Sequence, residues 1–136
     1  MIKARYLTVL AVSAFLMHGI WENAQAPLYA GYQSFPQHFP LCLVGTLGDV
    51  VITLSVLAFL WLLNKKELTH PLDFLALAIL GFFIAVIIEQ HALLTGTWNY
   101  APAMTIIPPL GVGLIPLFQM TILLPLSFAA AQAVKK

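Results

Sequence analysis

The chain has 136 residues, of which 61% are hydrophobic and 8% are charged, whereas a soluble domain carries roughly 25% charged residues. This shortage of charge, together with long apolar runs, excludes an ordinary soluble domain and predicts a polytopic membrane protein. The net charge of +1 provides no basic face, so we expect no nucleic-acid partner. The single cysteine, Cys42, excludes an internal disulfide.

Four apolar segments are long enough to cross a bilayer as helices, which requires about 20 residues each. They cover about residues 6–26, 41–63, 72–94 and 104–131. We therefore predict an all-α fold, a bundle of four transmembrane helices that forms a single membrane domain over residues 1–136. The first segment also resembles a signal peptide, but Pro27 follows the small residues 24–26 and should hinder cleavage there. We expect this segment to be a retained helix.

The connections between these segments contain interfacial and helix-breaking residues. The loop 28–39 and the turn 95–102 contain many aromatic residues, which are typical of a membrane–water interface. The connector 64–71 is polar. The fourth segment begins with several helix breakers, namely Pro108, Pro109, Gly111, Gly113 and Pro116. Because proline frees backbone carbonyls that must find other partners, we expect this start to be bent or partly unwound.

All basic residues fall on one side of the predicted bundle. They are Lys3, Arg5, Lys65, Lys66, Lys135 and Lys136. The positive-inside rule assigns that side to the cytoplasm, so both termini are expected to be cytoplasmic and the aromatic loops external. We expect a multi-pass protein of the bacterial inner (cytoplasmic) membrane.

Polar side chains from all four segments are predicted to lie at one level in the outer half of the bilayer. A helix rises about 1.5 Å per residue, which brings Glu22, Asp49, Glu89 and Gln119 to similar heights. A charged side chain at mid-membrane costs roughly 3 kcal/mol on insertion scales. We therefore expect the three acids to face one another, a cavity or a bound cation, and to include a neutral acid that can exchange a proton.

The first segment presents a polar face to this level. His18, Glu22 and Gln25 follow an i, i+4, i+7 spacing, which places them on one side of a helix with Trp21 beside them. Our candidate catalytic residues are the three acids, Glu22, Asp49 and Glu89. Our candidate binding residues are His18, Trp21, Gln25, His91, Trp98, Tyr100 and Gln119.

Simpler interpretations of these residues remain open. Glu22 can lie solvated at the headgroup level, and Gln119 can bond between helices without a further role. Trp98 and Tyr100 are also typical of an interfacial anchor. We expect no cofactor; the alternative is a divalent metal held by His18, Glu22, Asp49 and Glu89, whose nitrogen and oxygen ligands suit such an ion. The sequence contains no phosphate loop, HExxH, nucleophile elbow or CxxC motif.

Short motifs extend over most of the chain. They are Trp21-Glu22-x-x-Gln25-x-Pro27-Leu28-Tyr29, Gly48-Asp49, Glu89, Gly96-x-Trp98-x-Tyr100-x-x-x-Met104 and Gly113-Leu114-x-Pro116-Leu117-x-Gln119. In these motifs the chain resembles a group of small, uncharacterised bacterial integral membrane proteins with four helices. It is more loosely similar to membrane-embedded lycopene cyclase domains, which combine a Trp-x-Tyr or Trp-x-Phe element with intramembrane acids. Where those domains carry a Pro-x-Glu-Glu-like element, this chain has Pro116-Leu117-Phe118-Gln119. The looser similarity implies a lipid-soluble substrate.

Three functional hypotheses follow from the residues and the resemblance. The first is a buried acidic pocket that binds, and converts by acid–base and non-redox chemistry, a lipophilic or isoprenoid-like small molecule. The second is a small proton- or cation-coupled transporter that acts as a homodimer. The third is an accessory subunit of a larger membrane complex, in which the polar level joins the helices. Membrane lipids are expected partners under all three hypotheses.

Overall fold

The computed structural model describes residues 4–64 and 68–134, and these contain four long helices. They are α1 (Ala4–Gln25), α2 (Phe35–Leu62), α3 (Pro71–Thr95) and α4 (Leu114–Ala133). A short 3-10 turn, η1 (Ala26–Leu28), extends α1, and two short strands, β1 (Ile106–Ile107) and β2 (Val112–Gly113), precede α4. All four helices are long and apolar enough to cross a membrane.

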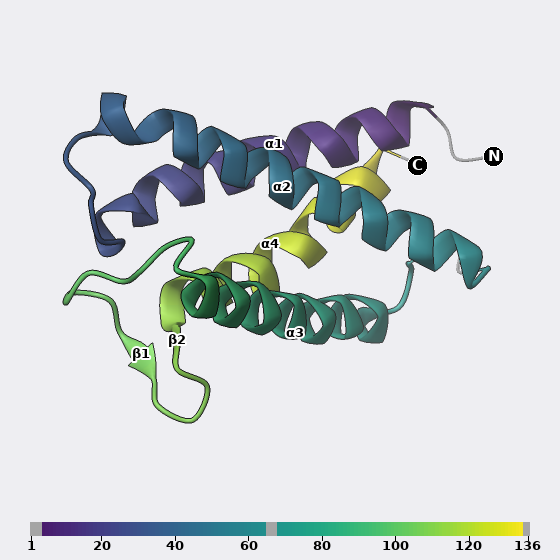
Figure 1. Cartoon of the computed structure of the whole chain (residues 1–136). Coiled ribbons are helices and arrows are strands. Elements are labelled where there is room, and N and C mark those ends of the chain that lie inside the picture. The colour runs from purple at the N-terminus through teal and green to yellow at the C-terminus, as the bar shows by residue number, and fades with distance from the viewer. Residues whose placement is uncertain (1–3, 65–67, 135–136) are drawn as a thin grey trace.

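The helices follow the spatial order α2, α1, α4, α3. α1 packs against both α2 and α4, and α4 packs against α3. α2 touches α4 only slightly, and α2 and α3 have no extended contact within the described residues. Figure 1 shows α2 and α3 on opposite sides of the molecule with α4 between and behind them, and both termini at the same end. The bundle is therefore open on the side between α2 and α3.

α2 begins six residues earlier than the expected start at residue 41. Its first residue is Phe35, and the preceding Ser34 has an extended backbone with φ −157° and ψ 159°. Pro36 lies in the first turn, where its missing N–H has no helical partner to lose. The aromatic residues that suggested a loop up to residue 39 therefore belong partly to α2.

α4 begins at Leu114 instead of the expected residue 104, so that boundary was wrong by a full ten residues. The intervening chain forms an antiparallel hairpin in which Ile106 pairs with Gly113 and Ile107 with Val112. Pro108 and Pro109 lie at its tip, where neither can donate a backbone hydrogen bond. Gly111 follows with a φ of +67°, which favours glycine. The prolines thus replace the start of a helix with a turn.

α3 lies close to the expected segment because its ends are marked locally. The His70 side chain accepts a hydrogen bond from Leu72 N, and the Asp73 carboxylate accepts from the backbone N–H of His70. Such reciprocal capping satisfies donors that a helix start leaves free. At the other end Gly96 has a φ of +69° and terminates the helix.

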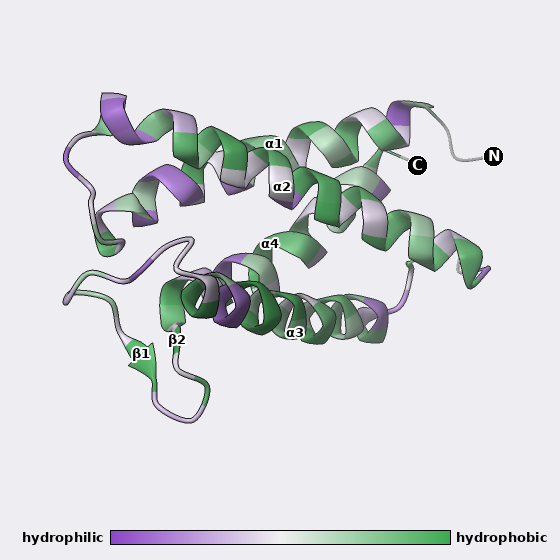
Figure 2. Cartoon of the chain, in the orientation of Figure 1, coloured by the Kyte–Doolittle hydropathy of each residue, from purple (hydrophilic) through white to green (hydrophobic). Residues whose placement is uncertain are grey.

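The most buried apolar residues lie where α1, α3 and α4 meet. They include Leu10, Leu77, Leu124 and Phe128. The outer faces of the helices are also apolar, since Ile20, Val44 and Ile87 are among many large side chains left exposed. Figure 2 shows hydrophobic residues along the middle of the helices and hydrophilic residues mainly towards their ends. This distribution is typical of helices surrounded by lipid.

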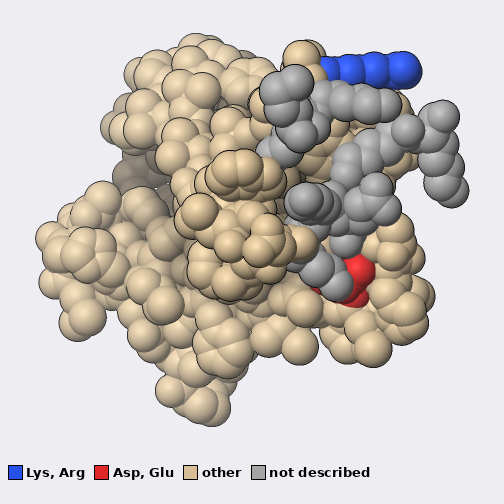
Figure 3. All heavy atoms as spheres, turned by 90° about the vertical axis from the view of Figure 1, so that its right-hand side faces the viewer, with Lys and Arg blue, Asp and Glu red and all other residues tan. Residues whose placement is uncertain are grey.

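Figure 3 views the end that carries the two termini and shows one basic and one acidic patch among the described residues. Arg5 is the basic residue within the described part of the chain. The other residues used to predict the cytoplasmic side, Lys3, Lys65, Lys66, Lys135 and Lys136, lie outside the described residues.

Candidate functional site

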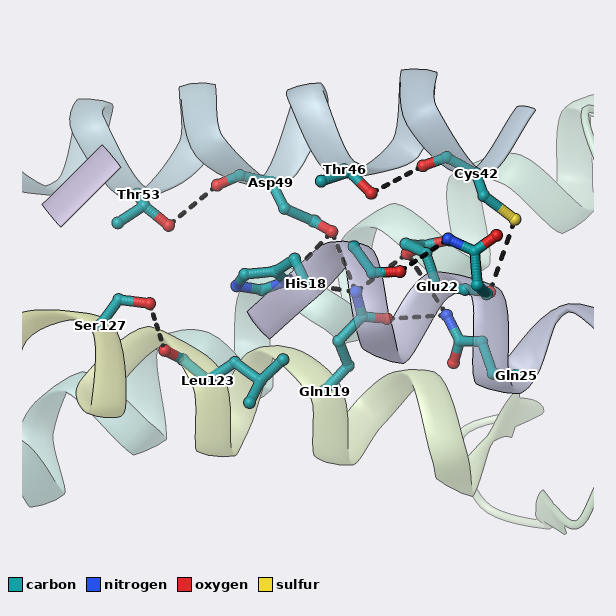
Figure 4. Close-up of polar contacts among 12 residues, drawn as sticks. His18, Glu22, Gln25, Cys42, Thr46, Asp49, Thr53, Gln119, Leu123 and Ser127 are labelled. Carbon is teal, nitrogen blue, oxygen red and sulfur yellow. Dashed lines mark hydrogen bonds and ion pairs between the residues drawn. The ribbon is translucent and has the colours of Figure 1, made fainter. Parts of the chain in front are cut away.

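The side chain of Gln119 connects three helices at the centre of a polar network (Figure 4). It extends from α4 and is 4% exposed. Its Nε2 lies 2.9 Å from Glu22 Oε1 on α1 and 2.9 Å from Asp49 Oδ2 on α2. Its Oε1 accepts a 2.7 Å hydrogen bond from Gln25 Nε2. The two carboxyl groups therefore lie side by side, because they bond the same amide nitrogen.

His18, one turn before Glu22 on α1, completes this network. Its Nδ1 lies 3.1 Å from Asp49 Oδ2 and 3.2 Å from Gln119 Nε2. The Gln119 amide has two hydrogens to donate, and the two carboxyl groups use both. The pattern therefore assigns the Nδ1 proton to His18, which donates it to Asp49. The ring is fully buried, and its Nε2 has no hydrogen-bond partner among the described residues.

A glycine on α2 makes room for the Glu22 carboxyl group. A Cβ atom built at Gly45 would lie 3.1 Å from Glu22 Oε2 and 3.2 Å from Glu22 Cδ. These distances are tighter than ordinary van der Waals contact, so a side chain at this position would push the carboxyl group away from α2. The lack of a side chain at Gly45 thus allows Glu22 to lie between the two helices.

Glu89 on α3 forms a second polar group with the loop that follows this helix. Trp98 Nε1 donates a 3.2 Å hydrogen bond to Glu89 Oε2, and the Tyr100 hydroxyl donates to the same oxygen. Tyr100 Oη in turn accepts a 2.9 Å hydrogen bond from the backbone N–H of Gly113. The loop and β2 are thereby held against the carboxyl group.

Two tyrosine hydroxyls near Glu89 are held in their protonated form. Burial, followed by the proximity of the Glu89 carboxyl group, raises the pKa of Tyr29 above its ordinary value of 10.0. Burial and the hydrogen bond to Glu89 likewise raise the pKa of Tyr100. The Tyr29 ring packs edge-on against Trp98, with ring centroids 6.2 Å apart. Both phenols therefore remain hydrogen-bond donors at neutral pH.

A cavity of about 460 Å³ connects the two polar groups. Its lining comes mainly from α2, with further residues from α3, from α4, from Glu22 on α1, and from the segments that follow α1 and α3. Glu22, Asp49, Glu89 and Gln119 line it, together with Trp98. The rest of the lining is largely apolar and includes Leu41, Val44, Ile52, Ala85, Ile88, Pro116 and Met120. The three candidate catalytic acids thus face one mostly apolar space.

The other candidate binding residues lie around the cavity without lining it. His18 and Gln25 contact the acids from behind, and Tyr100 contacts Glu89. The Trp21 indole nitrogen is buried and has no hydrogen-bond partner among the described residues. His91 differs from all of these, because it is exposed on α3 and is not part of the lining.

The four proposed metal ligands are divided between the two polar groups. His18, Glu22 and Asp49 surround Gln119, whereas Glu89 is held by the loop after α3. Within residues 4–64 and 68–134, no three His, Cys, Asp or Glu side chains are arranged to hold a metal ion. The donors that contact these acids are amide, indole, imidazole and hydroxyl groups.

Several lining residues were not among the candidates from the sequence. They are Tyr29, His38, Cys42, Gly45 and Gly48. The three on α2 nearest Asp49 follow an i, i+3 pattern, Cys42, Gly45 and Gly48, which is a signal of one helical face made of small residues. Tyr29 and His38 were interpreted only as part of an aromatic interfacial loop.

The raised pKa of the two tyrosines predicts how alkaline pH acts on the fold. Because the folded protein holds these protons more tightly than the unfolded chain, their contribution to stability is complete below about pH 10, the ordinary tyrosine pKa, and decreases above it. We expect the phenolate absorbance of Tyr29 and Tyr100 to appear only as the protein unfolds. A spectroscopic titration of Tyr29→Phe and Tyr100→Phe variants in detergent checks this. Phenolate signals from both residues in a protein that is still folded would contradict it.

The site therefore combines three carboxyl groups with fixed hydrogen-bond donors around a small apolar space. Such groups can give or take protons, and they can orient a ligand that has one polar end. No family model, no curated protein and no solved structure matches this chain.

Proposed function

We propose that this is a multi-pass protein of the bacterial inner membrane with both termini in the cytoplasm. Support comes from the four apolar helices and from the position of both termini at one end of the bundle. In the sequence the basic residues precede or begin α1, follow α2 and follow α4, and the positive-inside rule then assigns these connections to the cytoplasm. The cavity then lies in the outer half of the bilayer, near the aromatic loops, and the resemblance to small bacterial four-helix proteins agrees with this placement.

We propose further that the cavity binds a lipophilic, isoprenoid-like molecule and converts it by acid–base chemistry. One observation carries this proposal: Glu22, Asp49 and Glu89 reach one mostly apolar cavity from three different helices. Charged groups inside a membrane protein are costly and are usually kept for function. An apolar cavity with a few convergent polar groups is also the usual form of a small-molecule site.

The two polar groups suggest different roles in proton transfer. Glu22 and Asp49 share one amide nitrogen, so two full negative charges there would repel each other strongly unless one acid carries a proton. That proton is available to a carbon–carbon double bond of the ligand. Trp98 and Tyr100 donate hydrogen bonds to one oxygen of Glu89 and orient its carboxyl group, which would take the proton that the ligand loses. Addition of one proton to a double bond and loss of another from a neighbouring carbon would shift the double bond, or close a ring if a second double bond attacks the cation first, with no redox change.

Hydrogen exchange tests this proposal directly. The protein is reconstituted in phosphatidylethanolamine and phosphatidylglycerol vesicles in D₂O with a panel of isoprenoid alcohols and polyenes. We expect deuterium to enter one of these lipids, detected by mass spectrometry. Because each acid handles a proton in the reaction, Asp49→Asn and Glu89→Gln should each reduce the rate at least tenfold, equivalent to about 1.4 kcal/mol of barrier.

The matched control is Asp73→Asn, which changes an acid at the opposite end of α3. It should exchange at the rate of the unmodified protein. If Asp49→Asn and Glu89→Gln both retain full exchange, acid–base conversion is wrong. A lipid that binds without any exchange in the unmodified protein would reduce the proposal to binding alone.

A proton-coupled transporter is the second candidate, and one observation favours it. His18 is fully buried beside Asp49, and its Nε2 has no hydrogen-bond partner among the described residues. Buried chains of Asp, Glu and His side chains form the proton relays of membrane transporters. Figure 4 shows two further polar side chains, Thr53 on α2 and Ser127 on α4, on the side of His18 that is away from Glu22. Release of protons from the detergent-solubilised protein on addition of a ligand, without exchange into that ligand, would favour transport over conversion.

A further inference from the structure

Exposed residues of the cavity lining lie in two places, on α2 beside the gap between α2 and α3 and in the loops at Ala30 and Thr97. α2 contributes eight of the lining residues, from His38 to Ile52, and α3 contributes Ala85, Ile88 and Glu89. These two helices both line the cavity and yet have no extended contact within the described residues. α1 and α4 close the back of the cavity through Glu22 and Gln119. The open side therefore faces outwards between two apolar helices.

Gly48 marks the rim of this opening. It lines the cavity and is also exposed, and a Cβ atom built on it would meet no atom within 4 Å. Gly45, one turn away, differs because its Cβ would press on the Glu22 carboxyl group. Beside Gly48 on the rim, Leu41 and Val44 are 65% and 69% exposed. The rim on α2 is therefore apolar and has free space at one position.

The height of Gly48 places this opening well inside the apolar part of α2. At about 1.5 Å per residue, Gly48 lies roughly 20 Å from the start of α2 at Phe35. That distance corresponds to the middle of the helix, where Figure 2 shows hydrophobic residues on both α2 and α3. Water and lipid headgroups lie at the ends of a helix that crosses a membrane, and hydrocarbon chains surround its middle.

We infer that the cavity opens sideways into the hydrocarbon layer, and that its ligand enters between α2 and α3 past Gly48. This inference rests on the proposed function and narrows the ligand class. A molecule that passes an apolar rim within the bilayer must lose the hydration of any polar group, which is expensive for a charged headgroup. The ligand is therefore a membrane-dissolved chain molecule with no charged group, whose reactive end lies against the three acids.

Trp98 provides a probe for this opening because its indole lines the cavity. In a variant with Trp21→Phe and Trp61→Phe, all tryptophan fluorescence comes from Trp98. The probe molecules are phosphatidylcholine vesicles with brominated acyl chains, which quench indole on contact, and iodide, which quenches from water. We expect the brominated chains to quench Trp98 strongly and iodide to quench it little.

Substitutions on α2 distinguish the entry of lipid chains past Gly48 from a general effect of a larger side chain on the helix surface. Gly48→Phe should fill the rim and reduce quenching of Trp98 by brominated chains at least twofold. Leu47→Phe is the matched control, because Leu47 is exposed on the same helix and does not line the cavity. It should leave the quenching unchanged. If Gly48→Phe does not fold, Ile88→Phe narrows the same opening from α3 and should give the same reduction.

Three results would overturn the lateral opening. Stronger quenching by iodide than by brominated chains would show that the cavity opens to water. Equal quenching in the Gly48→Phe and Leu47→Phe variants would show that no chain passes Gly48. The lateral opening would also be overturned if brominated chains do not quench Trp98 when Gly48 is unchanged. A second copy of the chain that covers the gap between α2 and α3 would give this result. Each result leaves the deuterium exchange by Asp49 and Glu89 intact, so failure of the opening is distinguishable from failure of the proposed function.

Discussion

Gln119→Leu is expected to lower the free energy of unfolding by roughly 3 kcal/mol or more, because it removes several buried hydrogen bonds at once. Gln119 is the shared partner of Glu22, Asp49 and Gln25. A buried polar group left without a partner costs about 1–3 kcal/mol, and a charged one costs more. Leucine has a similar size, so the loss would reflect hydrogen bonding and not the volume of the side chain.

Thermal unfolding in detergent, followed by near-ultraviolet circular dichroism, measures this effect. Gln132→Leu provides the control, since it makes the same change on α4 at a half-buried position near the end of the helix. We expect it to remain within about 0.5 kcal/mol of the unmodified protein. If the two variants unfold at the same temperature, Gln119 does not hold the polar network together.

Gly81→Ala is expected to destabilise the packing of α3 on α4 by about 1–3 kcal/mol. A Cβ atom at Gly81 would lie 2.4 Å from the carbonyl oxygen of Met120 and 2.9 Å from its carbonyl carbon. These are backbone atoms, so no side-chain rotation can relieve the overlap, and the two helices must move apart. Small residues that allow such close approach are common where membrane helices meet.

The control for this prediction is the same substitution at a glycine with free space. Gly48→Ala on α2 meets no atom within 4 Å. Because alanine favours a helix over glycine by up to about 1 kcal/mol, this variant should be equally stable or slightly more stable. The pair can be compared by thermal unfolding in one detergent. Equal loss of stability in both variants would mean that replacing either glycine within its helix is destabilising in itself, and that the contact with Met120 is not the cause.

The sequence predicted the heights of the polar residues better than their directions. Apolar segment lengths and a fixed rise per residue brought Glu22, Asp49 and Gln119 to one level, and Gln119 donates a hydrogen bond to each of the two carboxyl groups. His91 shows the limit of this reasoning. It follows Glu89 by two residues, so it points to nearly the opposite side of α3 and is exposed, although its height is similar.

The sequence also did not predict which helices pack against each other. Nothing in the apolar pattern indicates that α3 packs on α4 while α2 packs on α1, an arrangement that leaves α2 and α3 apart with residues of both lining the cavity. The start of α4 was placed too early because an apolar run predicts burial but does not predict a particular backbone conformation. Pro108 and Pro109 signalled a disturbance there, but a bend and a hairpin are both compatible with two prolines.

The unequal lengths of the helices have a consequence for the bilayer itself. α2 has 28 residues and extends about 42 Å, whereas α4 has 20 residues and extends about 30 Å. In a hydrocarbon core of about 30 Å, α4 matches the core in length, whereas α2 exceeds it and would be accommodated by tilting or by a locally thicker bilayer. Since α2 is held mainly by α1, a thinner or thicker membrane would change its inclination relative to α3. For the opening inferred between α2 and α3, this predicts a width that depends on the lipid composition of the host membrane.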